Sequence, residues 1–368
     1  GGFTMNHRYG NALVFYGGGL CDCAAFYISQ LAQRLSQREL FEKTYVGFYS
    51  FRCLTEKGLI KEWNQRMYEK TINVFGGYFG TARKIDLASD TVLLERAITC
   101  CKQFNIKWIF LAGGDGSSRQ MAEIHKHFEQ EGIKFCFTMP MTIDGIEGGK
   151  AFGINSAVEA SLHQIETVSS TTLRTLDGNK YPGIVFELQG RNRDDILANV
   201  IFELYNTREI ADFQRDEIQI IGIPANMDWS EERLRARLHV EENPYQGEIL
   251  GKPTIILLSE GATISKKQIV ELAKEEGMKF RTFSIGHFSQ INGLTDEDEK
   301  EIIIATIEES VSIIEDYVVD ESSFTLVLDD CNFLDVRDAN YFADLNPRKN
   351  QRATLEPKLQ HILEMYLP

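Results

Sequence analysis

The stretch FLAGGDGSSRQ, Phe110–Gln120, decides the fold. An apolar run, 108–112, leads into two glycines, an acid and a third glycine. Buried parallel strands are continuous apolar runs, and a glycine turn at their carboxyl ends lets backbone N–H groups approach a phosphate closely. Asp115, inside the turn, would repel a bare phosphate but could hold Mg²⁺. The segment therefore indicates either a tight strand-to-helix turn or a site for a nucleotide with a metal.

Apolar runs alternate with helix-like segments along most of the chain, which predicts a layered α/β fold with parallel strands. The expected strands are 12–16, 45–49, 108–112, 134–138, 184–188, 218–223, 254–258 and 324–328. Isoleucines and valines at helical spacing between 302 and 314 predict a long helix. The acids at 296–298 suit the positive end of its dipole.

Composition excludes several partners. The 368 residues carry 39 Lys and Arg against 54 Asp and Glu, a net charge of -15, so the surface repels nucleic acid and anionic membranes. No apolar run reaches the roughly 18 to 20 residues of a membrane span. We expect a soluble, cytoplasmic protein that binds neither nucleic acid nor membrane. The seven cysteines have no CxxC spacing, which predicts reduced thiols.

Two more glycine loops and one acid extend the pattern. Gly17-Gly18-Gly19 follows the first expected strand, and GGYFGTAR, 76–83, ends in Arg83. Each loop alone fits a turn, whereas three loops with a cation predict a phosphate-binding face. Asp144 lies among glycines just after the strand at 134–138. There it could take a proton from a hydroxyl during phosphoryl transfer or serve as a loop cap.

The order of motifs resembles the ATP-dependent phosphofructokinase family from about residue 12 to residue 293. In sequence order the motifs are GGYFGTAR from Gly76, GGDGS from Gly113, TIDG from Thr142, FGINSAVEA from Phe152, FELQGR from Phe186, SEG from Ser259 and FRTFSIGH from Phe280. The resemblance implies two Rossmann-like three-layer α/β domains. We expect residues 5–155 plus 289–340 to bind the phosphate donor, and residues 156–288 plus 341–368 to bind the acceptor.

The resemblance also implies an ATP- and Mg²⁺-dependent kinase that phosphorylates a hydroxyl of a sugar phosphate, fructose 6-phosphate or a relative. Asp115 resembles the acid that organises Mg²⁺, and Gly116 stands where pyrophosphate users usually carry aspartate. The implied donor-site residues are Gly17, Gly18, Arg83, Gly114, Asp115, Gly116 and Ser117.

Catalysis is implied for three residues: Asp144 as the base, Thr142 as a contact of the moving phosphoryl group, and Arg191 as a stabiliser of transition-state charge. The implied acceptor-site residues are Gln189, Gly190, Glu260, Arg281 and His287. Some acceptor arginines of the family serve a neighbouring subunit, so Arg281 could do the same. The resemblance implies a homo-oligomer (dimer or tetramer) or a hetero-oligomer with a related subunit.

Two positions depart from the family pattern. Ile146 replaces a second acid that supports the metal, with Glu147 as the nearest substitute. Gln290 stands where an arginine normally grips the 6-phosphate, and a lost charged contact costs about 1.5 to 3 kcal/mol. Two alternatives therefore stay open: a kinase whose acceptor lacks the 6-phosphate, and a catalytically inactive nucleotide-binding regulatory or assembly subunit.

Overall fold

The structure is a computed structural model of the 368 residues. It describes residues 9–72, 76–82, 84–175, 180–190, 193–207, 209–239, 241–242, 249–286, 297–320, 322–345 and 355–368. The chain divides into two compact units. Unit 1 comprises Gly1–Ser156 and Gln290–Arg348, and unit 2 comprises Ala157–Ser289 and Lys349–Pro368.

Unit 1 is built on a seven-stranded sheet with the order β15-β14-β5-β4-β1-β2-β3. The five inner strands pair in parallel, whereas β3 and β15 run antiparallel at the two edges. Its strands are β1 (Asn11–Gly17), β2 (Thr44–Gly47), β3 (Ile60–Glu62), β4 (Ile106–Gly113), β5 (Lys134–Pro140), β14 (Phe324–Leu328) and β15 (Leu334–Asp338).

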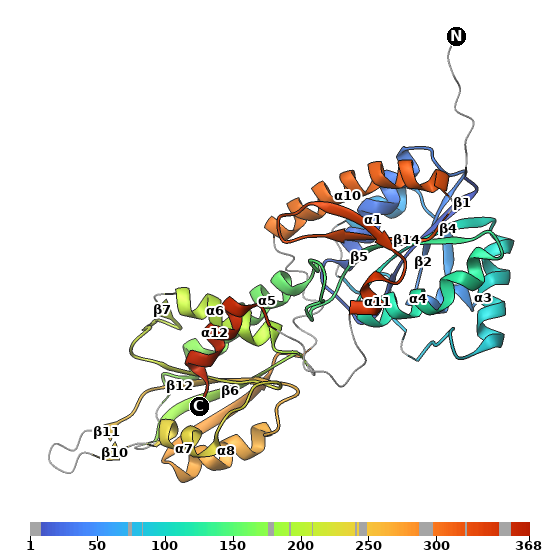
Figure 1. Ribbon diagram of the computed structural model, residues 1–368. Coiled ribbons are helices and arrows are strands. Elements are labelled where there is room, and N and C mark those ends of the chain that lie inside the picture. Colours follow the sequence, from blue (N-terminus) through green and yellow to red (C-terminus); the bar gives the residue numbers. More distant parts are fainter. Residues whose placement is uncertain are drawn as a thin grey trace. The chain divides into compact units, whose positions relative to one another are not determined.

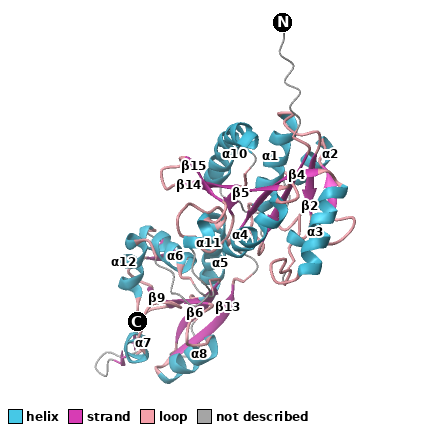
Figure 2. Ribbon diagram, turned by 45° about the vertical axis from the view of Figure 1, so that its right-hand side comes forward, coloured by secondary structure: helices cyan, strands magenta, loops and turns pink. Residues whose placement is uncertain are grey.

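Helices cover both faces of this sheet (Figures 1 and 2). Alternate residues of β1 explain the two layers, because Val14 packs with α1 and α10 while Phe15 packs with α3 and α4. The helical segments are α1 (Ala24–Gln37), η1 (Ser50–Leu54), α2 (Gln65–Thr71), α3 (Thr91–Gln103), α4 (Asp115–Glu129), α10 (Glu297–Tyr317), η2 (Val318–Asp320) and α11 (Tyr341–Leu345).

Unit 2 has a parallel four-stranded sheet with the order β13-β6-β12-β9. The helices α7 and α8 cover one face, and α5, α6 and α12 lie on the other (Figures 1 and 2). Its elements are α5 (Ile154–Thr172), β6 (Tyr181–Leu188), α6 (Asp195–Asn206), β7 (Glu209–Ile210), β8 (Phe213–Gln214), β9 (Gln219–Ile223), α7 (Glu231–Leu238), β10 (Glu241–Glu242), β11 (Ile249–Leu250), β12 (Thr254–Ser259), α8 (Lys266–Glu275), β13 (Met278–Ser284) and α12 (Pro357–Tyr366).

The predicted α/β class with two three-layer, Rossmann-like units is therefore confirmed. One expected boundary needs correction, because the described residues 341–345 belong to unit 1 and not to the second domain. Phe342 of α11 is fully buried there, with its ring 5.6 Å from that of Phe137. That aromatic contact ties α11 to the first sheet.

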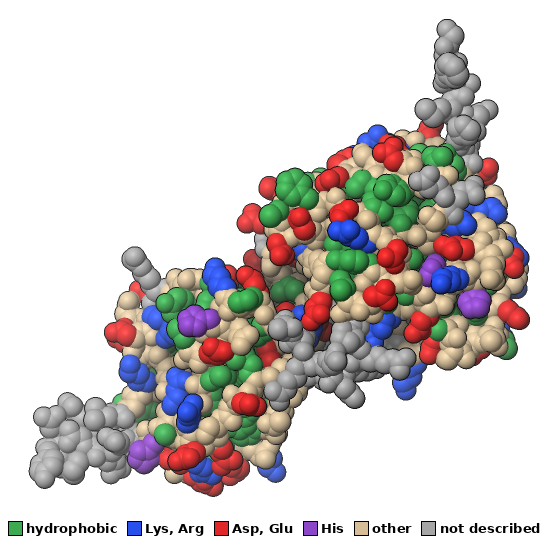
Figure 3. Space-filling model, viewed as in Figure 1, with side chains coloured by type: hydrophobic (Ala, Val, Ile, Leu, Met, Phe, Trp, Pro, Cys, Tyr) green, Lys and Arg blue, Asp and Glu red, His purple; other side chains and the backbone are tan. Residues whose placement is uncertain are grey.

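The remaining expectations concern surface and cysteines. Among the described residues, no helix is both long and apolar enough to cross a bilayer. All seven cysteines are free thiols, as expected. On the described surface visible in Figure 3, Lys and Arg side chains are interspersed with Asp and Glu.

Candidate active site

Three loops leave the same edge of the unit 1 sheet. Gly17 at the end of β1 pairs in register with Gly113 at the end of β4, and Gly113 pairs with Pro140 at the end of β5. Because these strands are parallel, the loops that follow them emerge side by side. Ligands of open α/β sheets bind at such carboxyl ends.

The glycines of these loops are required by close packing. A methyl group on Gly113 would overlap the carbonyl oxygen of Gly17 and lie 2.8 Å from Ser117 Oγ. Gly18 has a positive φ of 110°, which favours glycine, and a methyl group there would lie 3.5 Å from the backbone nitrogen of Gly114. The first two loops thus pack backbone against backbone, with the first turn of α4 beside them.

Two hydroxyl groups hold the loops in place. The Tyr16 hydroxyl donates to the carbonyl oxygens of Gly19 and, at 3.3 Å, Met141, so it links the loops after β1 and β5. Burial raises the pKa of Tyr16 well above its usual value, which keeps the phenol protonated as a donor. Thr81 donates to the Gly18 carbonyl, which brings the GGYFGTAR loop to the same edge. Sequence reasoning missed Tyr16, which looks like any apolar strand residue.

Asp115 begins α4, directly after Gly114. One carboxylate oxygen, Oδ2, accepts from Arg119 Nη2 one turn along the helix. The other, Oδ1, is buried and has no hydrogen-bond partner among the residues that the structure describes. A buried, unpaired carboxylate oxygen is costly, and a cation bound there would offset that cost.

This oxygen makes Asp115 the residue that fits Mg²⁺. Within the described part of the chain, no three His, Cys, Asp or Glu side chains gather as a complete metal site. A single carboxylate suits Mg²⁺ when the phosphates of a nucleotide and water supply the other ligands. Ile146 is 8% exposed and packs with Phe342 in the core, so it adds no ligand.

Thr142 and Asp144 stand in the loop after β5. A methyl group on Gly114 would lie 3.5 Å from Thr142 Cβ, which places this loop against the start of α4. The Thr142 hydroxyl oxygen accepts the backbone N–H of Asp144 at 3.1 Å. Its own proton is then available to a ligand, and the half-buried Asp144 carboxylate is held two residues away.

Glu299 fixes the next turn of the chain and was missed as a structural acid. It is 2% exposed, and its carboxylate accepts from the backbone N–H groups of Gly153 at 2.6 Å and Ser156 at 3.3 Å. The Ser156 hydroxyl donates to it as well, at 2.6 Å. Glu299 therefore caps the start of α5, and the sequence signal was only an acidic first turn of α10.

In unit 2, the carboxyl ends of β6 and β12 bring the predicted acceptor residues together. The Ser259 hydroxyl donates to the Gly190 carbonyl at 3.0 Å, and Glu260 N–H donates to the Leu188 carbonyl at 2.9 Å. Gly190 has a φ of 122° and is buried. Gln189, half-buried, and Glu260, exposed, thus flank one turn at this edge.

Arg281 does not join that turn within one chain. It lies in the middle of the edge strand β13, opposite Ile184, and its side chain is exposed. Gln189, just past the end of β6, is five residues farther along the chain than Ile184, a separation of roughly 16 Å at the usual strand rise. Arg83, Arg191, His287 and Gln290 lie outside the described residues.

The unit 1 site can therefore hold an anionic, metal-bound ligand. Backbone N–H groups of glycine turns and the positive end of α4 attract phosphate, while Asp115 provides a cation ligand. Asp144 supplies a carboxylate that can accept a proton beside the same loops.

Comparison with protein families agrees with this geometry. The family model described as phosphofructokinase matches residues 11–299. The chain belongs to the phosphofructokinase family. The match contains β1, β4, β5 and the glycine loops after them, and it ends at Glu299. A comparison of this chain with curated proteins finds no match.

Several solved phosphofructokinases share its fold. The enzyme of Pichia pastoris in the T-state has a TM-score of 0.71 and 15% identity, covering 93% of this chain and 38% of that chain. The Saccharomyces cerevisiae enzyme has a TM-score of 0.75 and 12% identity, covering 98% of this chain and 47% of that chain. The pyrophosphate-dependent enzyme of Marinobacter aquaeolei has a TM-score of 0.70 and 14% identity, covering 97% of this chain and 91% of that chain. The chain thus spans less than half the length of the two yeast chains.

Proposed function

We propose that this phosphofructokinase family member transfers the γ-phosphoryl group of ATP, with Mg²⁺, to a hydroxyl of a sugar phosphate. The observation that carries the proposal is that three loops leave the same edge of the unit 1 sheet: two rich in glycine, and one that carries Thr142 and Asp144. These loops contain Gly17, Gly113 and Thr142. Phosphoryl transfer needs positioning and charge stabilisation more than covalent help, which is what such a site offers.

Each loop has one task in this proposal. The backbone around Gly18 and Gly114 holds the donor phosphates. The Thr142 hydroxyl, which already accepts from Asp144 N–H, donates its proton to an oxygen of the moving phosphoryl group. Asp144 accepts the proton of the acceptor hydroxyl as the new P–O bond forms and the bond to ADP breaks. Mg²⁺ beside Asp115 would neutralise charge that develops on the phosphates.

ATP as donor rests on Gly116. Apart from its chain neighbours and the backbone of its own helix, nothing lies within 4 Å of a Cβ atom built at this exposed position, so the start of α4 leaves open space there. Pyrophosphate users of the family usually fill this position with aspartate. The open space suits the larger nucleotide.

The acceptor and assembly complete the proposal. Gln189, Gly190 and Glu260 form the acceptor turn of unit 2, with Arg191 and His287 as further contacts. Arg281, set apart from that turn within its own chain, serves the acceptor site of a second subunit in an oligomer. One observation favours the alternative of a regulatory nucleotide-binding subunit: Ile146 is packed into the core and leaves a single acid for the metal.

The Asp115→Asn variant tests the metal part of the proposal. Replacing the charged oxygen by an amide weakens an oxygen ligand of a hard cation, so we expect the Mg²⁺ concentration for half-maximal activity to rise at least about tenfold. Titration of activity with Mg²⁺ at constant ATP measures it.

Glu147→Gln is the comparison variant, because Glu147 is the nearest acid that could substitute for the one lost at Ile146, whereas the proposal assigns the metal to Asp115. The proposal expects an unchanged Mg²⁺ requirement in this variant. If the Mg²⁺ requirement rose in Glu147→Gln and stayed constant in Asp115→Asn, Glu147 and not Asp115 would be the metal ligand, and this part of the proposal would be wrong.

A further inference from the structure

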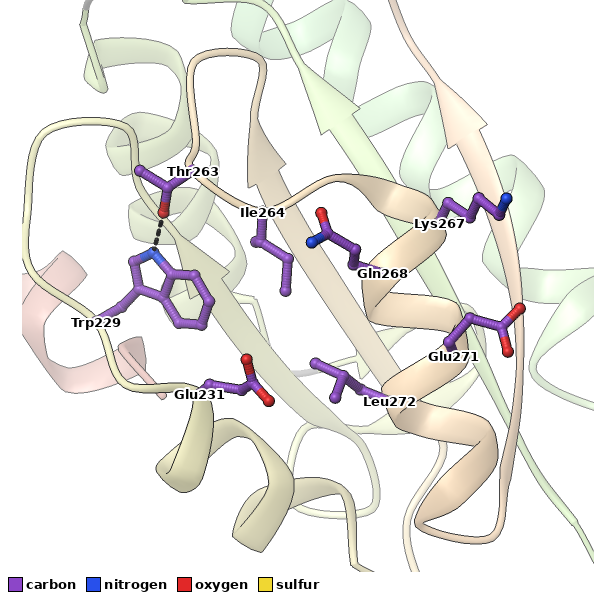
Figure 4. Close-up of a pocket in the computed structure, with 8 residues that line it drawn as sticks. All are labelled: Trp229, Glu231, Thr263, Ile264, Lys267, Gln268, Glu271 and Leu272. Atoms are coloured by element: carbon purple, nitrogen blue, oxygen red, sulfur yellow. Dashed lines mark hydrogen bonds between the residues drawn. The ribbon is translucent and has the colours of Figure 1, made fainter.

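Unit 2 contains a hollow that none of the residues discussed so far lines. It has a volume of about 620 Å³ and lies between the first turns of α7 and α8. Pockets for small molecules usually have volumes of roughly 300 to 1,000 Å³. Figure 4 shows three chain segments around it: Trp229 and Glu231 at the start of α7, Thr263 and Ile264 after β12, and α8.

One part of the wall of the hollow is apolar and is held by a hydrogen bond. The indole N–H of Trp229 donates to Thr263 Oγ1 at 3.3 Å, and the six-membered ring points into the hollow (Figure 4). Ile264 and Leu272 point toward the same space and are only 6% and 7% exposed. A half-buried indole therefore faces an aliphatic side chain across a gap, which suits a ring with a flat apolar face.

Two polar groups enter the hollow between these walls. Glu231 directs its carboxylate inward from α7, and Arg235 holds that carboxylate by donating to Oε1 at 3.1 Å. Gln268 enters from α8, and its amide oxygen already accepts from the N–H and hydroxyl of Ser265 at 2.9 and 2.8 Å. What Gln268 can offer a ligand is its NH₂ group.

The hollow therefore presents a fixed acceptor, Glu231, and a fixed donor, Gln268, beside an aromatic face. Hydroxyl groups both donate and accept hydrogen bonds, so a polyhydroxylated ring can satisfy both side chains. Lys267 and Glu271 of α8 also line the hollow (Figure 4). The lining thus carries two acids, Glu231 and Glu271, against one cation, Lys267, and this net negative charge disfavours a phosphate group on the ligand.

We propose that this hollow binds an uncharged carbohydrate. The C–H face of a sugar ring packs on Trp229, with Leu272 opposite, while its hydroxyls donate to Glu231 and accept from Gln268. The volume leaves room for a second sugar ring. The capping box of α8 and the Trp229–Thr263 bond fix the walls before the ligand arrives, so little ordering cost accompanies binding.

Tryptophan fluorescence tests the proposal on the whole chain. The other two tryptophans, Trp63 and Trp108, are 5% and 3% exposed in unit 1, so a ligand in the hollow acts on Trp229. Maltose, cellobiose and lactose are titrated, with glucose 6-phosphate and adenosine for comparison. We expect saturable binding of at least one disaccharide with a Kd of roughly 1 mM, and at least tenfold weaker binding of glucose 6-phosphate.

Three variants locate the site, each checked by thermal unfolding to be folded at the assay temperature; Leu272→Ala, which truncates a buried side chain, is expected to unfold at a lower temperature. Glu231→Gln is expected to weaken disaccharide binding about tenfold, and Leu272→Ala similarly, measured by calorimetry. Glu232→Gln, at an exposed position of α7 that does not line the hollow, is expected to bind as wild type does. Absence of saturation by all three disaccharides at roughly 50 mM overturns the proposal. Equal loss in Glu232→Gln, or tighter binding of adenosine than of any sugar, overturns it as well.

Discussion

Asp144→Asn lowers the rate of phosphoryl transfer by about 10²- to 10⁴-fold, the usual contribution of a general base. The amide keeps the size of the side chain and the backbone bond to Thr142 Oγ1, but it cannot accept a proton from the acceptor hydroxyl. Because the donor phosphates are held by the glycine loops, the affinity for ATP is expected to change less than about threefold. Steady-state kinetics and equilibrium nucleotide binding on the same preparation measure the two quantities.

Asp316→Asn provides the control for charge alone. Asp316 is an exposed acid near the end of α10, which leads to the amino end of β14, whereas the glycine loops leave the carboxyl ends of the parallel strands. Its variant is expected to keep the wild-type rate. If Asp144→Asn turned over as fast as wild type, Asp144 would have to be read as a loop cap, the alternative that its sequence context also allows.

Gly116→Asp is expected to lower kcat/KM for ATP at least about 100-fold. The new side chain enters the open space beside the phosphate loops and adds a negative charge. Repulsion between this carboxylate and a donor phosphate about 4 Å away costs about 4 kcal/mol at an effective dielectric constant near 20. The variant is expected to fold, because a Cβ atom at this position meets nothing within 4 Å outside its own helix and chain neighbours, and an acid suits the first turn of α4.

Gly116→Asn separates bulk from charge at the same position. We expect this variant to retain more ATP-dependent activity than Gly116→Asp, with both compared at saturating acceptor. Pyrophosphate is assayed in parallel with each protein. A wild-type chain that uses pyrophosphate better than ATP would contradict the assignment of the donor.

The inner strands could be predicted because they are buried on both faces. Every expected strand run overlaps a strand of the structure, since parallel strands covered by helices are continuous apolar segments. β13 and β15 were not predicted as strands. They lie at sheet edges, where exposed charges such as Lys279, Arg281 and Arg337 interrupt any apolar run.

The candidate site could be predicted to the extent that glycine spacing reports close backbone approach. Gly17, Gly113 and Gly114 meet as expected, because strand register alone brings the ends of β1 and β4 together. Tyr16 and Glu299 could not be found this way. Their roles depend on carbonyl and N–H groups that are 125 and 146 residues distant in sequence, and no local pattern encodes such contacts.

Transfer of the γ-phosphoryl group from ATP is the central claim, and one measurement tests it most directly. The wild-type chain is incubated with γ-labelled ATP, Mg²⁺ and either fructose 6-phosphate or fructose, and the products are separated. We expect label on a sugar bisphosphate together with an equal amount of ADP. Bound ATP with no label on any sugar would contradict the claim and favour a regulatory subunit, and label on fructose alone would contradict the sugar phosphate as acceptor.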